Sequence, residues 1–497
     1  MKQGGGAWSK RKGKRRFNAR EPKLKKRGRK EEYTMERKNA WAAYAQDDSK
    51  VEAFAKAYRD FIDNGKTERE CVDYAVKMAK ERGFEDLMAA VREGRKLSAG
   101  ARVYVNWMGK CFMLFVLGEK PLDAGMNILG AHIDSPRIDV KQNPLYEDKD
   151  LAYLDTHYYG GIKKYQWVAI PLALHGVIVK KSGEKVLVNI GEADSDPVFC
   201  ISDLLVHLAQ EQMSKDAKSV IEGEALNLIV GGRPLADEEK DAVKANVLKI
   251  LKDKYDVEEE DFLSAELEIV PAGKARDMGF DRSMILGYGH DDRVCAYPSM
   301  AAVLDYEGTP EYTLCCVITD KEEIGSVGAT GMGSHYFENT VAELYACTKD
   351  YCELGVRRTL MNSRMLSSDV SAGFDPNFAS AFEAKNSAFL GRGICFNKFT
   401  GSRGKSGSND ANPEFMASLR KIMDDEGVAF QTAELGRVDL GGGGTIAYLC
   451  AKYGMNVIDS GIAVLSMHAP YEIISKVDLY EGYRCYCAFL KGAHPVD

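Results

Sequence analysis

Apolar and polar residues follow two different periods along this chain, and these periods separate helical from extended segments. Helical spacing begins at about residue 36 and continues in the stretches 51–54, 67–82 and 84–95. Strand-like apolar runs follow at 101–107, 111–117 and 126–130. The first part of the chain therefore predicts a helical lead-in followed by the start of a sheet.

The pattern changes between residues 140 and 285. Apolar runs typical of strands lie at 167–174, 176–179 and 185–190, and helices are predicted near 201–213 and 236–255. After residue 285 the alternation of strands and helices resumes. It predicts a strand buried on both faces at 312–319, helices at 301–304 and 413–426, and a short buried strand at 462–465.

This order favours an α/β domain in two parts, 35–139 and 286–497, interrupted by an inserted domain at 140–285. Residues 1–34 are rich in glycine, lysine and arginine and nearly free of aliphatic side chains, so we expect a basic disordered extension. A nucleic-acid-binding arm is the alternative for this segment. A third interpretation is an upstream extension ahead of a start at Met35.

Composition excludes several classes of protein. The 497 residues are 45% hydrophobic and 28% charged, as in soluble globular proteins, and we expect no membrane span because no apolar run approaches ~18 residues. Neither an apolar stretch nor a cleavage site follows the basic start, which argues against a secretory signal. The 12 cysteines include no Cys-x-x-Cys spacing, and reduced thiols in a cytoplasmic protein are expected.

Five clusters of potential metal ligands lie at or near the ends of apolar runs, where a parallel sheet presents reactive side chains. They are His132-Ile133-Asp134, Asp291-Asp292, Glu322-Glu323, Ser368-Asp369 and Met467-His468. Each cluster alone is compatible with a structural role. Together they predict one site rich in carboxylate and imidazole groups, which is typical of a two-metal hydrolase.

The segment from Asp320 to Gly328 is the most specific of these. Two adjacent glutamates after a buried strand are electrostatically unfavourable unless cations lie nearby. In an extended backbone they would point in opposite directions, so that one could bind metal while the other acts on a water molecule.

These motifs resemble those of the M18 metallo-aminopeptidases, which include aspartyl aminopeptidase and vacuolar aminopeptidase I. The resemblance rests on Gly130 to Pro136, Asp291-Asp292, Asp320 to Ser326, Ser368-Asp369 with Pro376-Asn377, and Met467-His468, and it covers about residues 35–490. It implies a mixed-sheet zinc-peptidase domain with helices on both faces, interrupted by a smaller β-rich dimerisation domain. It further implies peptide substrates and a dodecamer built from dimers.

The same resemblance implies roles for individual residues. His132, Asp291 and Asp369 would hold one divalent ion, and Asp291, Glu323 and His468 would hold the other. Zinc is favoured, with manganese or cobalt as alternatives. Glu322 would be the general base on a metal-bridging water, and Asp134 would orient His132.

The chain departs from aspartyl aminopeptidases in the segment 162–168 and at Ala372, which replaces a family histidine. The expected substrates are therefore peptides with either an acidic or a neutral N-terminal residue. Lys164, Lys398 and Gly443 are the candidate substrate contacts. The alternative functions are a deacylase or carboxypeptidase on the same scaffold, a nucleic-acid-binding protein acting through the basic arm, and a catalytically silent assembly protein.

Overall fold

The computed structural model describes residues 38–402 and 404–496. The expected basic extension at 1–34 lies outside this range. Within it, the strands form three sheets of nine, six and five strands. No helix of the described part has both the length and the apolar character that crossing a bilayer requires.

The nine-stranded sheet is mixed, as the resemblance implies. Its strands, in spatial order, are β1 (Glu85–Asp86), β2 (Arg102–Trp107), β3 (Cys111–Val116), β13 (Thr313–Thr319), β4 (Met126–His132), β14 (Arg364–Ser368), β18 (Asn456–Gly461), β16 (Ile394–Asn397) and β17 (Phe430–Thr432). The four central strands β13, β4, β14 and β18 are parallel. Their carboxyl ends therefore lie at the same edge of the sheet.

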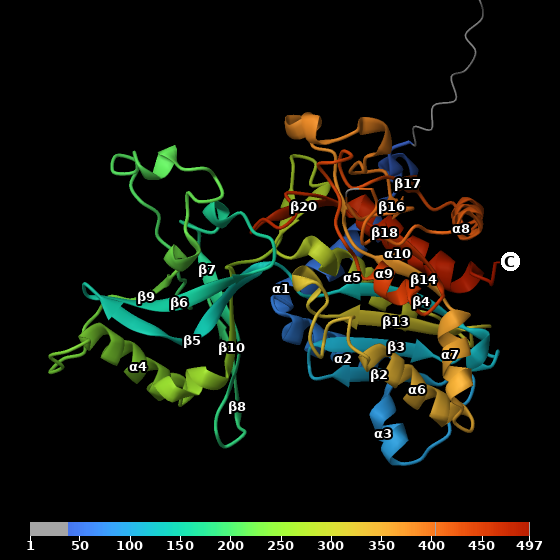
Figure 1. The fold of residues 1–497 in the computed structure, drawn as a ribbon, viewed down its shortest axis with the longest axis horizontal. Helices are drawn as coiled ribbons and strands as arrows, with labels where there is room; N and C mark the ends of the chain where they lie inside the picture. The colour runs from blue at the N-terminus through green and yellow to red at the C-terminus, as the bar shows by residue number, and fades with distance from the viewer. Residues whose placement is uncertain (1–37, 403, 497) are drawn as a thin grey trace, which may run out of the picture. The chain divides into compact units, whose positions relative to one another are not determined.

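Helices cover both faces of this sheet because its strands alternate between two apolar cores (Figure 1). In β13, Leu314 and Cys316 point into one core, while Cys315 and Val317 point into the other. The first core is completed by α1 (Ser49–Asn64), α2 (Glu68–Glu81), α5 (His290–Leu304), α8 (Pro413–Asp425) and α10 (Lys476–Gly492). The second contains α3 (Leu87–Arg92), α6 (Tyr336–Thr348), α7 (Glu353–Met361) and α9 (Ala447–Ala451).

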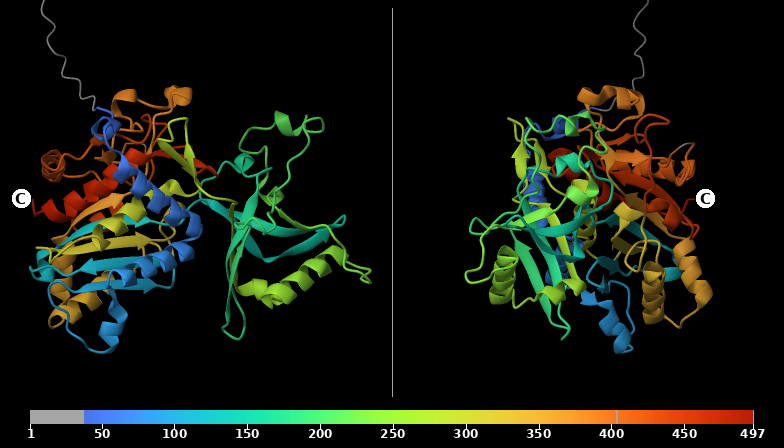
Figure 2. Two further views of the ribbon diagram at one scale, coloured as in Figure 1. Left: turned by 180° about the vertical axis from the view of Figure 1, so that it is seen from behind. Right: turned by 60° about the vertical axis from the view of Figure 1, so that its left-hand side comes forward.

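Local sequence explains where α2 begins. Thr67 accepts a hydrogen bond from the Glu70 backbone N–H, and the Glu70 side chain accepts one from the Thr67 backbone N–H. This reciprocal pair satisfies two donors at the helix start that have no partner within the helix. Figure 2 shows α1 and α2, in blue, running across the sheet when it is seen from behind.

The six-stranded sheet is antiparallel and has its own apolar core. Its strands, in spatial order, are β8 (Lys185–Ile190), β7 (Leu172–Val179), β10 (Ala265–Pro271), β5 (Arg137–Asp148), β6 (Leu151–Tyr159) and β9 (Leu228–Gly231). The helix α4 (Ala242–Tyr255) packs against this core. The five-stranded sheet consists of β11 (Arg276–Met278), β12 (Met284–Gly287), β20 (Glu472–Ser475), β19 (Ala463–Leu465) and β15 (Ser371–Ala372).

Two secondary-structure predictions are wrong in this region. The segment 201–213 is not a helix: it is irregular except for a short 3-10 helix at Gln212–Ser214. Most of its large apolar side chains, including Leu205 and Leu208, are exposed, so little apolar burial stabilises a helix there. The strand expected at 167–174 begins only at Leu172, directly after Pro171, which has no N–H to donate to a neighbouring strand.

Candidate metal centre and active site

Three of the predicted clusters follow parallel strands of the nine-stranded sheet. His132 ends β4, Glu322 and Glu323 follow β13, and Asp369 follows β14. Thr319 at the end of β13 is paired with His132, so the glutamates emerge beside the histidine. The sheet register therefore brings together ligands that are far apart in the sequence.

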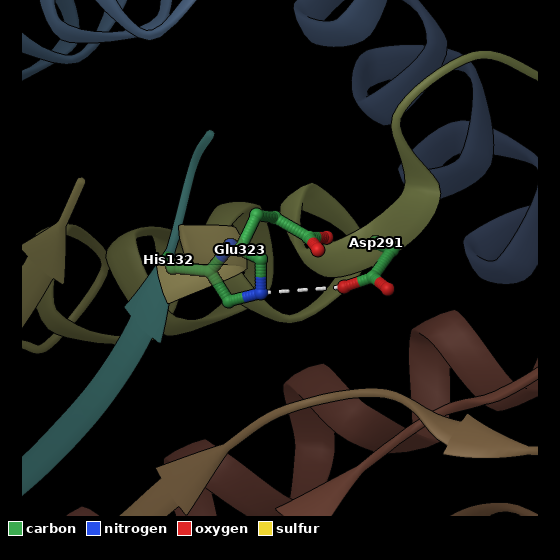
Figure 3. A group of neighbouring side chains, drawn as sticks. All are labelled: His132, Asp291 and Glu323. Carbon is green, nitrogen blue, oxygen red and sulfur yellow. Dashed lines mark ion pairs between the residues drawn. The ribbon is translucent and has the colours of Figure 1, made fainter. Parts of the chain in front are cut away.

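The other two candidate ligands come from a helix start and a turn. Asp291 lies at the start of α5, and His468 lies in the turn between β19 and β20. His132 Nε2 is 3.3 Å from Asp291 Oδ1 and 4.0 Å from Asp369 Oδ1. His468 Nε2 is 3.2 Å from Asp291 Oδ2 and 3.6 Å from Glu323 Oε2. Figure 3 shows the His132, Asp291 and Glu323 side chains converging.

The two carboxylate oxygens of Asp291 therefore face two different imidazoles. Asp291 is 3% exposed, and its Oδ1 is buried without a hydrogen-bond partner. A carboxylate in this position can bridge two cations, each completed by one histidine and one further carboxylate.

Backbone carbonyls fix the tautomer of both histidines. His132 Nδ1 is 3.0 Å from the Asp134 carbonyl oxygen, and His468 Nδ1 is 2.9 Å from the Gly161 carbonyl oxygen. A carbonyl oxygen only accepts hydrogen bonds, so Nδ1 carries the proton in each ring. Each Nε2 is then oriented toward the carboxylates and is suited to bind a metal ion.

Asp134 holds three parts of the site together. Its carboxylate accepts hydrogen bonds from the backbone N–H groups of Glu322, at 3.1 Å, and Glu323, at 3.2 Å. It also lies 3.3 Å from His132 Nδ1 and accepts a 2.8 Å hydrogen bond from the Tyr159 hydroxyl. Asp134 thus contacts His132, Tyr159 and the backbone of both glutamates, while its orienting role stays a prediction.

The expected extended conformation of the two glutamates is wrong. Residues Glu322–Ile324 form a 3-10 turn between Lys321 and Gly325, which both adopt left-handed backbone angles. The two side chains nevertheless reach different partners. Glu322 Oε2 lies 4.0 Å from His132 Nε2, whereas Glu323 Oε2 faces His468.

Glu472 was not predicted from the sequence. Its buried carboxylate accepts hydrogen bonds from the backbone N–H groups of Asp291, at 3.0 Å, and His468, at 2.8 Å. It thus holds the candidate bridging ligand and the second histidine in place. A single glutamate after Tyr471 carries no sequence signal for this role.

The electrostatics of the site favour cations. Burial raises the pKa of Glu322 to about 7, and it also raises the pKa of Glu323 and Asp369. Burial alone lowers the pKa of His468, but the hydrogen bond with Asp291 and the charge of Glu323 raise it to about 10. Several ionised carboxylates in one buried site are costly, and divalent cations would offset that cost.

Comparison with known proteins identifies the family. The model of the aminopeptidase I zinc metalloprotease family (M18) matches residues 61–490. A probable M18 family aminopeptidase 1 from Clostridium acetobutylicum is 60% identical over 457 residues, covering 92% of this chain and 98% of that relative. The chain belongs to the M18 family of aminopeptidases. It is therefore a metal-dependent peptide hydrolase, as the motifs imply.

Solved M18 structures share this fold. An M18 aminopeptidase from Thermotoga maritima superposes with a TM-score of 0.88 at 43% identity, covering 92% of this chain and all of that one (100%). Aminopeptidase I from Clostridium acetobutylicum has a TM-score of 0.86 at 58% identity, covering 92% and 99%. The more distant structure of the Saccharomyces cerevisiae mApe1 dodecamer has a TM-score of 0.71 at 20% identity, covering 88% of this chain and 97% of that one.

A cavity of about 480 Å³ opens beside the M18 metal-ligand candidates. Gly443 lines it, but the other two candidate substrate contacts do not. Lys398 Nζ pairs with Asp410, and Lys164 Nζ lies 5.9 Å from the Tyr158 ring centroid. None of the lining residues in the described ranges 38–402 and 404–496 is lysine or arginine.

Proposed function

We propose that this M18 enzyme is a two-metal aminopeptidase in which Asp291 would contribute to holding both ions. His132 and Asp369 would complete one site, and Glu323 and His468 would complete the other. Asp291 carries the proposal, because its two oxygens lie 3.3 and 3.2 Å from the Nε2 atoms of two histidines. Imidazole and carboxylate ligands suit zinc, the metal named for the family.

Two bound ions would polarise the scissile carbonyl and help to activate a water molecule. Glu322 accepts the proton of the attacking water and delivers it to the departing amine. This role agrees with its position on the turn after β13, where its Oε2 lies 4.0 Å from His132 Nε2. Asp134 keeps this turn next to His132 through its bonds to the two glutamate N–H groups.

We further propose a preference for neutral over acidic N-terminal residues. The described wall of the cavity contains the apolar side chains of Val370, Leu435 and Met467, and none of its described side chains is a lysine or an arginine. It also contains the buried carboxyl group of Asp459, which disfavours an acidic neighbour. Lys398 is paired with Asp410 and is withdrawn from this wall.

Assembly into a dodecamer built from dimers, with residues 140–285 as the dimerisation domain, is part of the proposal. The segment 198–213 supports it by exposing several apolar side chains. They are Val198, Leu204, Leu205, Val206, Leu208 and Met213. Light scattering should report a mass near twelve chains, whereas a monomer at micromolar concentration would refute the assembly.

Chelation and metal restoration test the catalytic proposal. The enzyme should hydrolyse peptides with a free N-terminal amine, lose activity on treatment with a chelator, and regain it with zinc. N-acetylated peptides of the same sequence should not be cleaved. Cleavage of the acetylated peptides, or of the C-terminal residue, would instead support a deacylase or carboxypeptidase.

A further inference from the structure

The end of β6 reaches the candidate metal centre from the six-stranded sheet. Its last residue, Tyr159, donates a 2.8 Å hydrogen bond to Asp134 Oδ2. Two residues later, the Gly161 carbonyl accepts a 2.9 Å hydrogen bond from His468 Nδ1. Tyr159 at the end of β6 and Gly161 just beyond it thus support groups on both sides of Asp291.

The two glycines allow this approach. Gly160 has a φ of +73°, a conformation that other residues rarely adopt, and a Cβ there would lie 3.4 Å from the Glu323 side chain. A Cβ on Gly161 would lie 3.3 Å from His468 Nδ1, closer than an ordinary contact. A side chain at position 161 would therefore require the His468 imidazole to move by a few tenths of an ångström.

Tyr159 is itself held in place by its own sheet. The buried Arg137 guanidinium lies 3.9 Å from the centre of the Tyr159 ring. Arg137 Nε donates to Asp139 at 2.8 Å and lies 3.1 Å from Glu268 Oε2. The ring is thus packed against a paired, immobile cation, and the hydroxyl is directed at Asp134.

We propose that Tyr159 and Gly161 are positioning residues that set zinc affinity from the six-stranded sheet, one for each half of the metal centre. Tyr159 acts through Asp134 on His132, and Gly161 acts directly on His468. The inference rests on the proposed function, because it assumes that these histidines bind zinc. Loss of such an outer hydrogen bond typically weakens metal affinity about 10–100-fold.

Tyr159→Phe tests the first half, because it removes one oxygen and keeps the ring against Arg137. Tyr158→Phe is the matched control, since the Tyr158 ring is 42% exposed on the neighbouring position of the same strand. Full-length protein is loaded with zinc, and transfer of the ions to a chromophoric chelator is followed. Wild type and Tyr158→Phe should give the same two affinities, and Tyr159→Phe should weaken one of them about 10–100-fold.

Gly161→Ala is the second variant, and it should lower the affinity for the other zinc ion, the one assigned to His468. In both variants activity should fall at limiting zinc and recover in excess zinc, a rescue that a general folding defect would not show. Wild type that binds no zinc would refute the proposed function itself. If wild type binds two zinc ions and both variants bind them with the same affinities, only the positioning role is overturned. The positioning role is also overturned if each variant loses activity in proportion to a lower unfolding midpoint and added zinc does not restore that activity.

Discussion

Replacing Glu322 by glutamine should separate catalysis from metal binding. The amide keeps the size of the side chain, and the backbone N–H that bonds to Asp134 is unchanged. Glutamine cannot accept a proton from water at neutral pH, so the proposed proton transfer is lost. His132, Asp291 and the other candidate ligands remain, and the variant should therefore bind as much zinc as wild type.

The expected loss follows from the surroundings of Glu322. A positioned general base contributes about 10²–10⁴-fold to a rate, which corresponds to roughly 3–5 kcal/mol. The neighbouring carboxylates Asp291, Glu323 and Asp369 are assigned to metal ions and are poor substitutes as a base. We therefore expect a loss of kcat near the upper limit, about 10³–10⁴-fold.

The assay compares kcat, KM and zinc content for wild type, Glu322→Gln and Glu323→Gln. The first variant should keep two zinc ions and a KM close to wild type while kcat falls. The second is the matched control: it should lose zinc, because it removes a candidate ligand facing His468. A Glu322→Gln enzyme with full zinc content and kcat within a few-fold of wild type would refute the base assignment.

Three further predictions concern stability, geometry and substrate. Burial alone lowers the pKa of His175, but hydrogen bonds with Glu192 and Glu70 raise it above the ordinary 6.5. The protonated ring therefore stabilises the fold below about pH 6.5, and this contribution is lost as the pH rises through the raised pKa. Denaturant unfolding should show the advantage of wild type over His175→Gln shrinking as the pH rises above about 6.5, and a constant difference would contradict the pairing. A Cβ at Gly461 would lie 1.8 Å from the Asp369 carbonyl oxygen. Gly461→Ala should thus cost about 1–3 kcal/mol in urea unfolding and reduce activity, whereas unchanged stability and activity would contradict this packing. In a panel of aminoacyl chromogenic substrates, leucine and methionine should exceed aspartate and glutamate in kcat/KM, and the reverse order would refute the neutral preference.

The strands that carry the site could be predicted because their sequence patterns are strong. The apolar runs at 126–130 and 312–319 correspond to β4 and β13, and the helical spacing at 413–426 corresponds to α8. Each run is fully buried, so composition alone marks it. The ligand-bearing clusters follow such runs, and a parallel sheet brings strand ends together.

The outer support of the site could not be predicted in the same way. Tyr159 ends β6, Gly161 lies just beyond it, and Glu472 comes from β20, so their contacts depend on tertiary structure. The segment 201–213 failed for the opposite reason. Its helical pattern is genuine, but most of its large apolar side chains are exposed in the part of the chain that the structure describes.

Anomalous X-ray diffraction at the zinc edge, from crystals of the zinc-loaded enzyme, tests the central claim most directly. Two peaks should lie on either side of the Asp291 carboxylate, one beside His132 and one beside His468. A single peak, or zinc bound away from Asp291, would contradict a two-metal centre bridged by this residue.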